Sequence, residues 1–183
     1  MNNQNKKIFS VKTLTMSAIF TALITVLTMF VSVAIPGGHG YIHLGDSMIY
    51  ACAWALGGPL AGVASALGSI LADFFLGYLI YIPATLVIKF LMGYVCFLIM
   101  KAFKYRFITS ILAMIAAALI MLLGYTLYEY ILVRIIDPVT FLNNLVQAVG
   151  GVVTGAILIF VLDKINAFTP YITWKANKAN ERN

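Results

Sequence analysis

The sequence predicts an all-α integral membrane protein with six transmembrane helices, a short or irregular second helix, and both termini in the cytoplasm. Three observations lead to this fold class. Hydrophobic residues make up 62% of the 183 residues, compared with about 45–50% in soluble domains. Charged residues make up 10%, compared with about 25% in soluble domains. Several segments are apolar on every face, whereas a helix of a soluble bundle needs a polar face. We therefore expect one membrane domain, 1–183, in contact with the lipid bilayer.

Turn-forming residues separate the first two predicted helices. An apolar run over about 8–35 follows a polar start and ends at 36–40 (PGGHG), a composition that breaks helices. The second helix, about 44–56, ends at 57–59 (GGP). A spanning helix needs about 20 apolar residues. We therefore expect the second helix to be irregular or to span only part of the bilayer.

The other four predicted helices are long enough to cross the bilayer. The third, about 59–76, begins with a proline, which is favourable at the first helical position, and ends at a glycine. The fourth, about 82–103, also has a proline near its start. The fifth, about 107–135, stops before the Asp-Pro pair at 137–138, and the sixth, about 139–165, is followed by a polar tail.

Lysine and arginine residues predict the orientation of the chain. They concentrate before the first helix, between the fourth and fifth helices, and after the sixth. Six crossings place these three regions on one side of the membrane, and positively charged loops face the cytoplasm. We expect a multi-pass protein of the bacterial cytoplasmic membrane. The net charge of +6 comes from these regions and not from one basic helix face, so nucleic acid is not an expected partner.

Polar side chains inside the apolar segments are the candidates for function. Each costs about 2.5–3.5 kcal/mol at mid-bilayer, so each needs a partner or a role. At about 1.5 Å per helical residue, several of them lie at one level near the outer end of the bundle, together with tyrosines. Such a layer predicts a small-molecule pocket with aromatic walls. The candidate substrate-binding residues are Tyr41, His43, Asp46, Asp73, Tyr78, Lys89, Tyr125, Glu129, Asn143 and Gln147.

Each candidate also has a purely structural interpretation. For Asp73 and Lys89, a buried ion pair between the two side chains is an alternative that we weight equally with contact to a ligand. In the same way, Asp46 is a possible N-cap of the second helix, and His43 is a possible solvated loop residue. The tyrosines then form an interfacial aromatic belt. Three residues near Pro138 are alternatively helix caps or turn residues: Asp137, Asn143 and Asn144.

The sequence has no motif for catalysis or for nucleotide binding. The HExxH, GxSxG and GxxxxGK[ST] patterns are all missing, so neither a zinc protease, nor a serine nucleophile, nor a phosphate loop is predicted. Two histidines in one loop do not make a metal site without further ligands. We expect no enzyme activity, no cofactor and no metal. Uphill transport would then draw its energy from a partner or from an ion gradient.

Four stretches carry a family resemblance: 41–46 (YIHLGD), 57–62 (GGPLAG), 72–78 (ADFFLGY) and 83–89 (PATLVIK). Their succession resembles the substrate-binding S components of energy-coupling-factor (ECF) vitamin transporters. The branch it resembles includes S components for riboflavin, hydroxymethylpyrimidine and vitamin B6-type substrates. The resemblance spans about 16–162.

The resemblance implies a substrate-binding subunit of an ABC-type importer for a small water-soluble vitamin or precursor. Hydroxymethylpyrimidine or a vitamin B6 vitamer is the favoured substrate, and riboflavin is next. The implied partners are a membrane-embedded coupling (T) component and two cytoplasmic ATPases. Ala18 and Ala22 match the AxxxA pattern by which the family packs its first helix on the coupling component, since two alanines give a flat strip for another helix. The first outer loop, 36–46, would close over the ligand.

Three other functions stay open on the sequence alone. A stand-alone ion-coupled carrier of small molecules would need an inverted repeat and carboxylates at the membrane centre. The sequence shows no clear repeat, and its carboxylates map closer to the outer surface. An intramembrane enzyme would need a catalytic pair. A purely structural subunit would leave the outer polar layer without a role.

Overall fold

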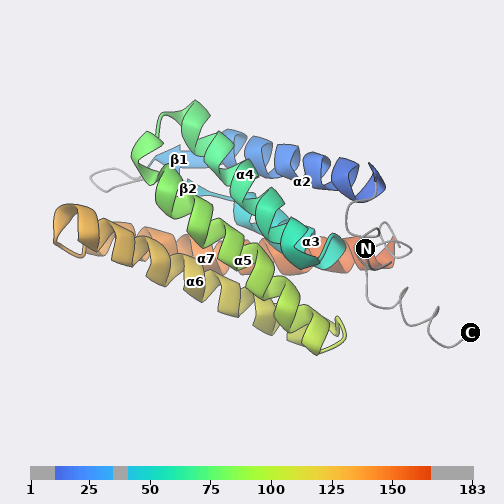
Figure 1. Ribbon diagram of the computed structural model, residues 1–183. Coiled ribbons are helices and arrows are strands. Elements are labelled where there is room, and N and C mark those ends of the chain that lie inside the picture. Colours follow the sequence, from blue (N-terminus) through green and yellow to red (C-terminus); the bar gives the residue numbers. More distant parts are fainter. Residues whose placement is uncertain (1–10, 35–40, 166–183) are drawn as a thin grey trace, which may run out of the picture.

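Five segments of the structure are long and apolar enough to cross a membrane, which agrees with the sequence prediction. The computed structural model describes residues 11–34 and 41–165 (Figure 1). The elements in chain order are α2 (Val11–Phe30), β1 (Ser32–Ala34), β2 (Tyr41–His43), α3 (Gly45–Ala55), α4 (Gly58–Leu76), the 3-10 turn η1 (Leu79–Tyr81), α5 (Ile82–Ala102), α6 (Phe107–Val133) and α7 (Pro138–Lys164).

Helix α3 is the short second helix that the sequence predicts. Its 11 residues reach about 16 Å at 1.5 Å per residue, which is about half of the 30 Å hydrocarbon core. Ten of the 11 residues are buried, and α3 contacts α2, α4, α5 and α7. The short helix therefore lies at the centre of the bundle, where its buried residues are surrounded by other helices.

The first helix ends five residues earlier than predicted because the chain turns into a strand. Helix α2 ends at Phe30, and β1 then pairs antiparallel with β2, with Ser32 opposite His43. The Ser32 hydroxyl donates to the carbonyl of Met29 at 2.9 Å, which helps to close the helix end. The segment 31–34 (VSVA) continues the apolar run, and a short apolar run alone does not distinguish helix from strand. Residues 8–10 and 36–40 of the predicted helix and loop lie outside the described residues.

Small residues let the helices approach closely inside the bundle. A Cβ atom added at Gly62 of α4 would lie 2.9 Å from the ring of Phe90 in α5. A Cβ atom at Gly155 of α7 would lie 2.7 Å from the ring of Tyr50 in α3. Side chains at these two positions would therefore separate the helices. Helix α4 ends at Gly77, whose φ of 83° is in the left-handed region that favours glycine.

The connections gather at the two ends of the bundle. We call the end that carries β1, β2, η1 and the turn from α6 to α7 the pocket end (Figure 1). The start of α2, the turn from α5 to α6 and the end of α7 lie at the opposite end, which we call the basic end (Figure 1). Lys101, Lys104, Arg106 and Lys164 belong to the basic end. This separation is the one on which the predicted orientation rests.

Candidate functional site

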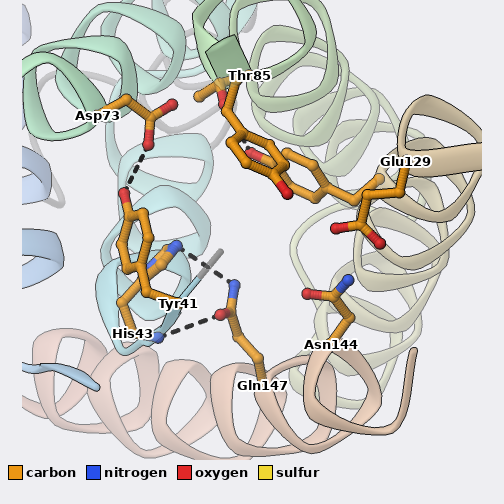
Figure 2. A pocket seen from close by; sticks show the side chains of 9 residues that line it. Tyr41, His43, Asp73, Thr85, Glu129, Asn144 and Gln147 are labelled. Carbon is orange, nitrogen blue, oxygen red and sulfur yellow. Dashed lines mark hydrogen bonds between the residues drawn. The ribbon is translucent and has the colours of Figure 1, made fainter. Parts of the chain in front are cut away.

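A cavity at the pocket end lies between β2 and the helices α4, α5, α6 and α7 (Figure 2). It contains about 370 Å³ of space, part of which is open to solvent at its mouth. Its wall is made almost entirely of polar and aromatic side chains, which is unusual in a chain as apolar as this one. The lining residues are Tyr41, His43, Asp73, Tyr81, Thr85, Tyr125, Glu129, Asn144 and Gln147.

A cluster that we call the ion-pair cluster is made of His43, Asp46, Lys89 and Gln147. His43 and Gln147 line the cavity, and Asp46 and Lys89 do not. The ammonium Nζ of Lys89 lies 2.5 Å from Oδ1 of Asp46, and both residues are at most 1% exposed. The side-chain amide of Gln147 donates to Oδ2 of Asp46 at 2.9 Å. Both carboxylate oxygens of Asp46 are therefore paired, which a buried charge requires.

This pairing corrects two expectations from the sequence. The alternative of an Asp73–Lys89 ion pair is wrong, because the carboxylate that pairs with the ammonium of Lys89 is that of Asp46 in α3. The N-cap interpretation of Asp46 is also wrong. Leu44 is the N-cap of α3 and makes no side-chain cap, whereas Asp46 lies in the first turn and points at α5 and α7.

His43 is a buried member of the cluster, so its interpretation as a solvated loop residue is wrong. It is 6% exposed, and its main-chain N–H donates to Oε1 of Gln147 at 3.1 Å. Its Nδ1 accepts from the main-chain N–H of Gly45 at 3.1 Å, and its Nε2 lies 3.3 Å from the side-chain nitrogen of Gln147. Because Nδ1 accepts a hydrogen bond, it carries no proton, which favours the neutral ring. Burial, with a smaller contribution from Lys89, lowers the pKa of His43 to about 4.

Asp73 of α4 forms the opposite wall of the cavity and is only partly paired. The hydroxyl of Tyr41 donates to Oδ1 of Asp73 at 2.6 Å, whereas Oδ2 has no hydrogen-bond partner among the described residues. Asp73 is 3% exposed. A buried carboxylate oxygen without a partner is costly, so it marks a place where a ligand gains by donating a hydrogen bond.

Tyrosine rings form a continuous aromatic wall around the cavity. The ring of Tyr41 lies 4.6 Å from that of Tyr78, centroid to centroid, and Tyr81 lies 6.3 Å from both Tyr78 and Tyr125. The hydroxyls of Tyr125 and Thr85 share a hydrogen bond at 3.0 Å. Three of these rings, those of Tyr41, Tyr81 and Tyr125, line the cavity. They offer flat apolar faces to a ring-shaped ligand.

Glu129 and Asn144 approach the cavity from the remaining side (Figure 2). Both are 7% exposed, and Nδ2 of Asn144 has no hydrogen-bond partner among the described residues. The neighbouring Asn143 is not part of the wall, because its side-chain amide donates to the carbonyl of Val139 in its own helix. Asp137 caps α7 by accepting from the main-chain N–H groups of Val139 and Thr140.

The structure brings most of the sequence-predicted residues to one place. Six of them line the cavity: Tyr41, His43, Asp73, Tyr125, Glu129 and Gln147. Asp46 and Lys89 lie directly behind it, and Tyr78 packs behind Tyr41. Asn143 lies outside it. The sequence reasoning did not select three lining residues: Tyr81, Thr85 and Asn144.

The other predicted surface lies on α2, which contributes no residue to the described lining of the cavity. Ala18 and Ala22 are both exposed, so the strip they form is open to a neighbouring helix. Within residues 11–34 and 41–165, no group of three or more His, Cys, Asp and Glu side chains is arranged to hold a metal ion. The arrangement of the cavity is suited to holding a polar ring by stacking and hydrogen bonds.

Two comparisons with known proteins find sequences similar to this chain. The model of the family described as "ECF-type riboflavin transporter, S component" matches residues 8–166, which include every residue that lines the cavity. A protein of Pyrococcus woesei, described as "Uncharacterized protein in gap 3'region", is 35% identical over 142 residues. That match covers 77% of this chain and 95% of the relative.

Proposed function

The chain belongs to the family of ECF-type riboflavin transporter S components, and from this premise we propose that its cavity binds a small nitrogen heterocycle of the vitamin type. Membership makes the chain a substrate-binding subunit of an ECF importer for a vitamin. The substrate itself, the residues that contact it and the surface that docks on the coupling component are proposed below.

The observation that carries the proposal is a cavity whose polar wall includes buried atoms without partners. Native proteins pair most buried polar groups, and Oδ2 of Asp73 and Nδ2 of Asn144 are exceptions on the same cavity. A heterocycle placed between the rings of Tyr41 and Tyr125 would satisfy these atoms with its own donor and acceptor groups. It would also stack on the tyrosines, an interaction worth about 0.5–1.5 kcal/mol beyond the buried area.

The size of the cavity favours a single-ring substrate. Its 370 Å³ includes space that is open to solvent at the mouth, so the enclosed space is smaller and suits a single ring better than the three fused rings of riboflavin. We therefore propose hydroxymethylpyrimidine or a vitamin B6 vitamer as the substrate, with riboflavin as the next candidate. The residues proposed to contact it are the nine that line the cavity. Among these, Gln147 is held in position by its hydrogen bonds to Asp46 and to the main chain of His43.

The substrate proposal is tested by calorimetric titration of the purified, detergent-solubilised protein with hydroxymethylpyrimidine, pyridoxine and riboflavin. We expect one of the two single-ring compounds to bind most tightly, with a Kd below about 1 μM, which corresponds to about −8 kcal/mol. Tightest binding of riboflavin would contradict the single-ring proposal. Failure of all three compounds to bind would contradict the proposed substrate class.

We further propose that the exposed strip of Ala18 and Ala22 docks on a membrane-embedded coupling component that works with two cytoplasmic ATPases, in the bacterial cytoplasmic membrane. Ala18→Leu should leave ligand binding unchanged and abolish uptake in cells that contain the whole transporter, because a larger side chain separates the helices. Leu23→Phe is the matched control, since Leu23 is exposed and lies about 100° around the helix from Ala22. Equal uptake by both variants would contradict the docking proposal.

A further inference from the structure

The cavity has an unbalanced charge. Two of its nine described lining residues, Asp73 and Glu129, carry carboxyl groups, and none of the nine is lysine or arginine. The sequence between β1 and β2, 35–40 (IPGGHG), contains no lysine or arginine either. The wall is therefore acidic, although the chain as a whole carries a net charge of +6.

The nearest ammonium group does not offset this charge. The Nζ atom of Lys89 lies 5.5 Å from the ring centroid of Tyr125, but Lys89 does not line the cavity, and its charge is matched by Asp46 at 2.5 Å. His43 is the remaining basic side chain on the described wall. Its Nδ1 accepts from the main-chain N–H of Gly45 and so carries no proton, which means that the neutral ring is the form that fits there.

Two unpaired polar atoms lie on different walls of the cavity. Asp73 is 3% exposed and its Oδ2 has no hydrogen-bond partner among the described residues, while Nδ2 of the 7% exposed Asn144 is also without one. The two side chains approach the cavity from opposite sides, and Glu129 lies next to Asn144 (Figure 2). A ligand that fills the space therefore meets an acceptor at one wall, and a donor beside a second carboxylate at the other.

We infer that the cavity selects neutral or cationic heterocycles that donate hydrogen bonds from hydroxyl, amine or ring N–H groups, and that it excludes phosphorylated or carboxylate-bearing forms of the same compounds. This inference rests on the proposed function, because it specifies the substrate class of the same cavity. The physical reason is that charges interact strongly in a buried site of low dielectric. An anion would be placed against two carboxyl groups with no lysine or arginine among the described lining residues to pair with it, whereas donor groups would pair with Oδ2 of Asp73.

The experiment uses pairs of compounds that differ only by a phosphate group. The purified full-length protein is incubated with an equimolar pool of pyridoxine, hydroxymethylpyrimidine and riboflavin together with the phosphate ester of each. Retained compounds are identified by mass spectrometry after rapid desalting. The retained compound and its phosphate ester are then titrated separately by calorimetry.

We expect the protein to retain an unphosphorylated compound and to bind its phosphate ester at least about 100-fold more weakly, as like-charge contacts in an interface predict. A phosphate ester that binds as tightly as its parent would overturn the inference and leave the proposed function standing. Retention of nothing from the pool would contradict the proposed function, and the inference would fail with it.

Two variants test whether the carboxylates cause the exclusion. Asp73→Asn and Glu129→Gln replace each carboxyl group by an amide of the same shape, so each should lower the ratio of the ester's Kd to the parent compound's Kd by about 10-fold. The matched control is Asp163→Asn, which makes the same change of charge at an exposed residue of the basic end and should leave the ratio unchanged. The ratio is measured within each variant, so a general loss of affinity cancels. An unchanged ratio in the Asp73→Asn/Glu129→Gln double variant would overturn the inference.

Discussion

Two groups of buried polar side chains lie side by side in this protein and differ in how completely they are paired. In the ion-pair cluster, Asp46 uses both carboxylate oxygens, one on Lys89 and one on Gln147. On the cavity wall, Asp73 uses one oxygen on Tyr41 and leaves the other without a partner among the described residues. Both aspartates are at least 97% buried, so burial alone does not distinguish a structural group from one that is available to a ligand.

We infer that the first group holds helices together, and we propose that the second group contacts the ligand. The ion-pair cluster joins β2, α3, α5 and α7. The unpaired atoms of the wall join nothing within the described chain. Variants of the two groups should therefore affect different measurements.

The largest expected effect is on stability, when the ion pair is broken. Lys89→Met should lower the free energy of unfolding by about 3–5 kcal/mol, because it leaves the charge of Asp46 buried without its partner. Thermal unfolding in detergent, followed by circular dichroism, measures the change. Lys101→Met is the control, since Lys101 is exposed on the same helix and its loss should change little. A Lys89→Met variant as stable as the wild type would show that the cluster does not hold the bundle.

The next largest effect concerns the dependence of stability on pH. The pKa of His43 is about 4 in the folded protein, compared with about 6.5 for an unperturbed histidine. Above pH 6.5 neither state binds the proton. Between pH 6.5 and 4 only the unfolded state binds it, so stability falls as the pH falls through this window. The full loss approaches about 3 kcal/mol.

Unfolding at pH 7 and at pH 5 in wild type and in His43→Gln separates this effect from that of the carboxylates. Glutamine does not titrate, so the variant should lose less stability between the two values than the wild type does. An equal loss in both proteins would mean that His43 is not held in its neutral form by the fold.

A third effect should appear in binding and not in stability. Asp73→Asn replaces an ionised acceptor by a neutral group. Because a hydrogen bond to a charged group is worth about 1.5–3 kcal/mol, ligand affinity should fall by about 10- to 100-fold. The free energy of unfolding should change by less than about 1 kcal/mol, since the amide oxygen can still accept from Tyr41. Calorimetric titration and thermal unfolding of the same sample give both numbers. Loss of stability without loss of affinity would place Asp73 with the structural group.

The smallest expected effect comes from two adjacent asparagines. Asn144→Ala should weaken ligand binding by about 5- to 10-fold, the value of one neutral hydrogen bond of about 1 kcal/mol. Asn143→Ala should leave the affinity unchanged, because Asn143 bonds to its own helix. Equal effects in the two variants would show that the side chain of Asn144 does not reach the ligand.

The sequence predicted the bundle well because apolar length and turn residues dominate in a membrane. The five spanning helices and the short α3 follow directly from them. The hairpin of β1 and β2 was missed, since its strands have three residues each and such short runs carry no periodicity that distinguishes helix from strand.

The sequence predicted the cavity as a layer of polar residues, but it did not predict which carboxylate pairs with Lys89. Depth along a helix places Asp46, Asp73 and Lys89 near one another, but it does not say which carboxylate reaches the ammonium. That choice depends on α3 lying at the centre of the bundle. Similarly, Asn143 and Asn144 are adjacent in sequence and both lie about one turn from Gln147, so only the rotation of α7 decides which of them faces the cavity.

The shortness of α3 also bears on how the chain is made. A segment of 11 residues is too short to be released into lipid as an independent span during synthesis, and it carries the acidic Asp46. Its counter-charge, Lys89, is synthesised 43 residues later, in a helix that is long enough to insert. We therefore expect α3 to reach its final depth only after α5 has entered the bilayer. The helices would then reach their final positions in an order that differs from their order in the sequence.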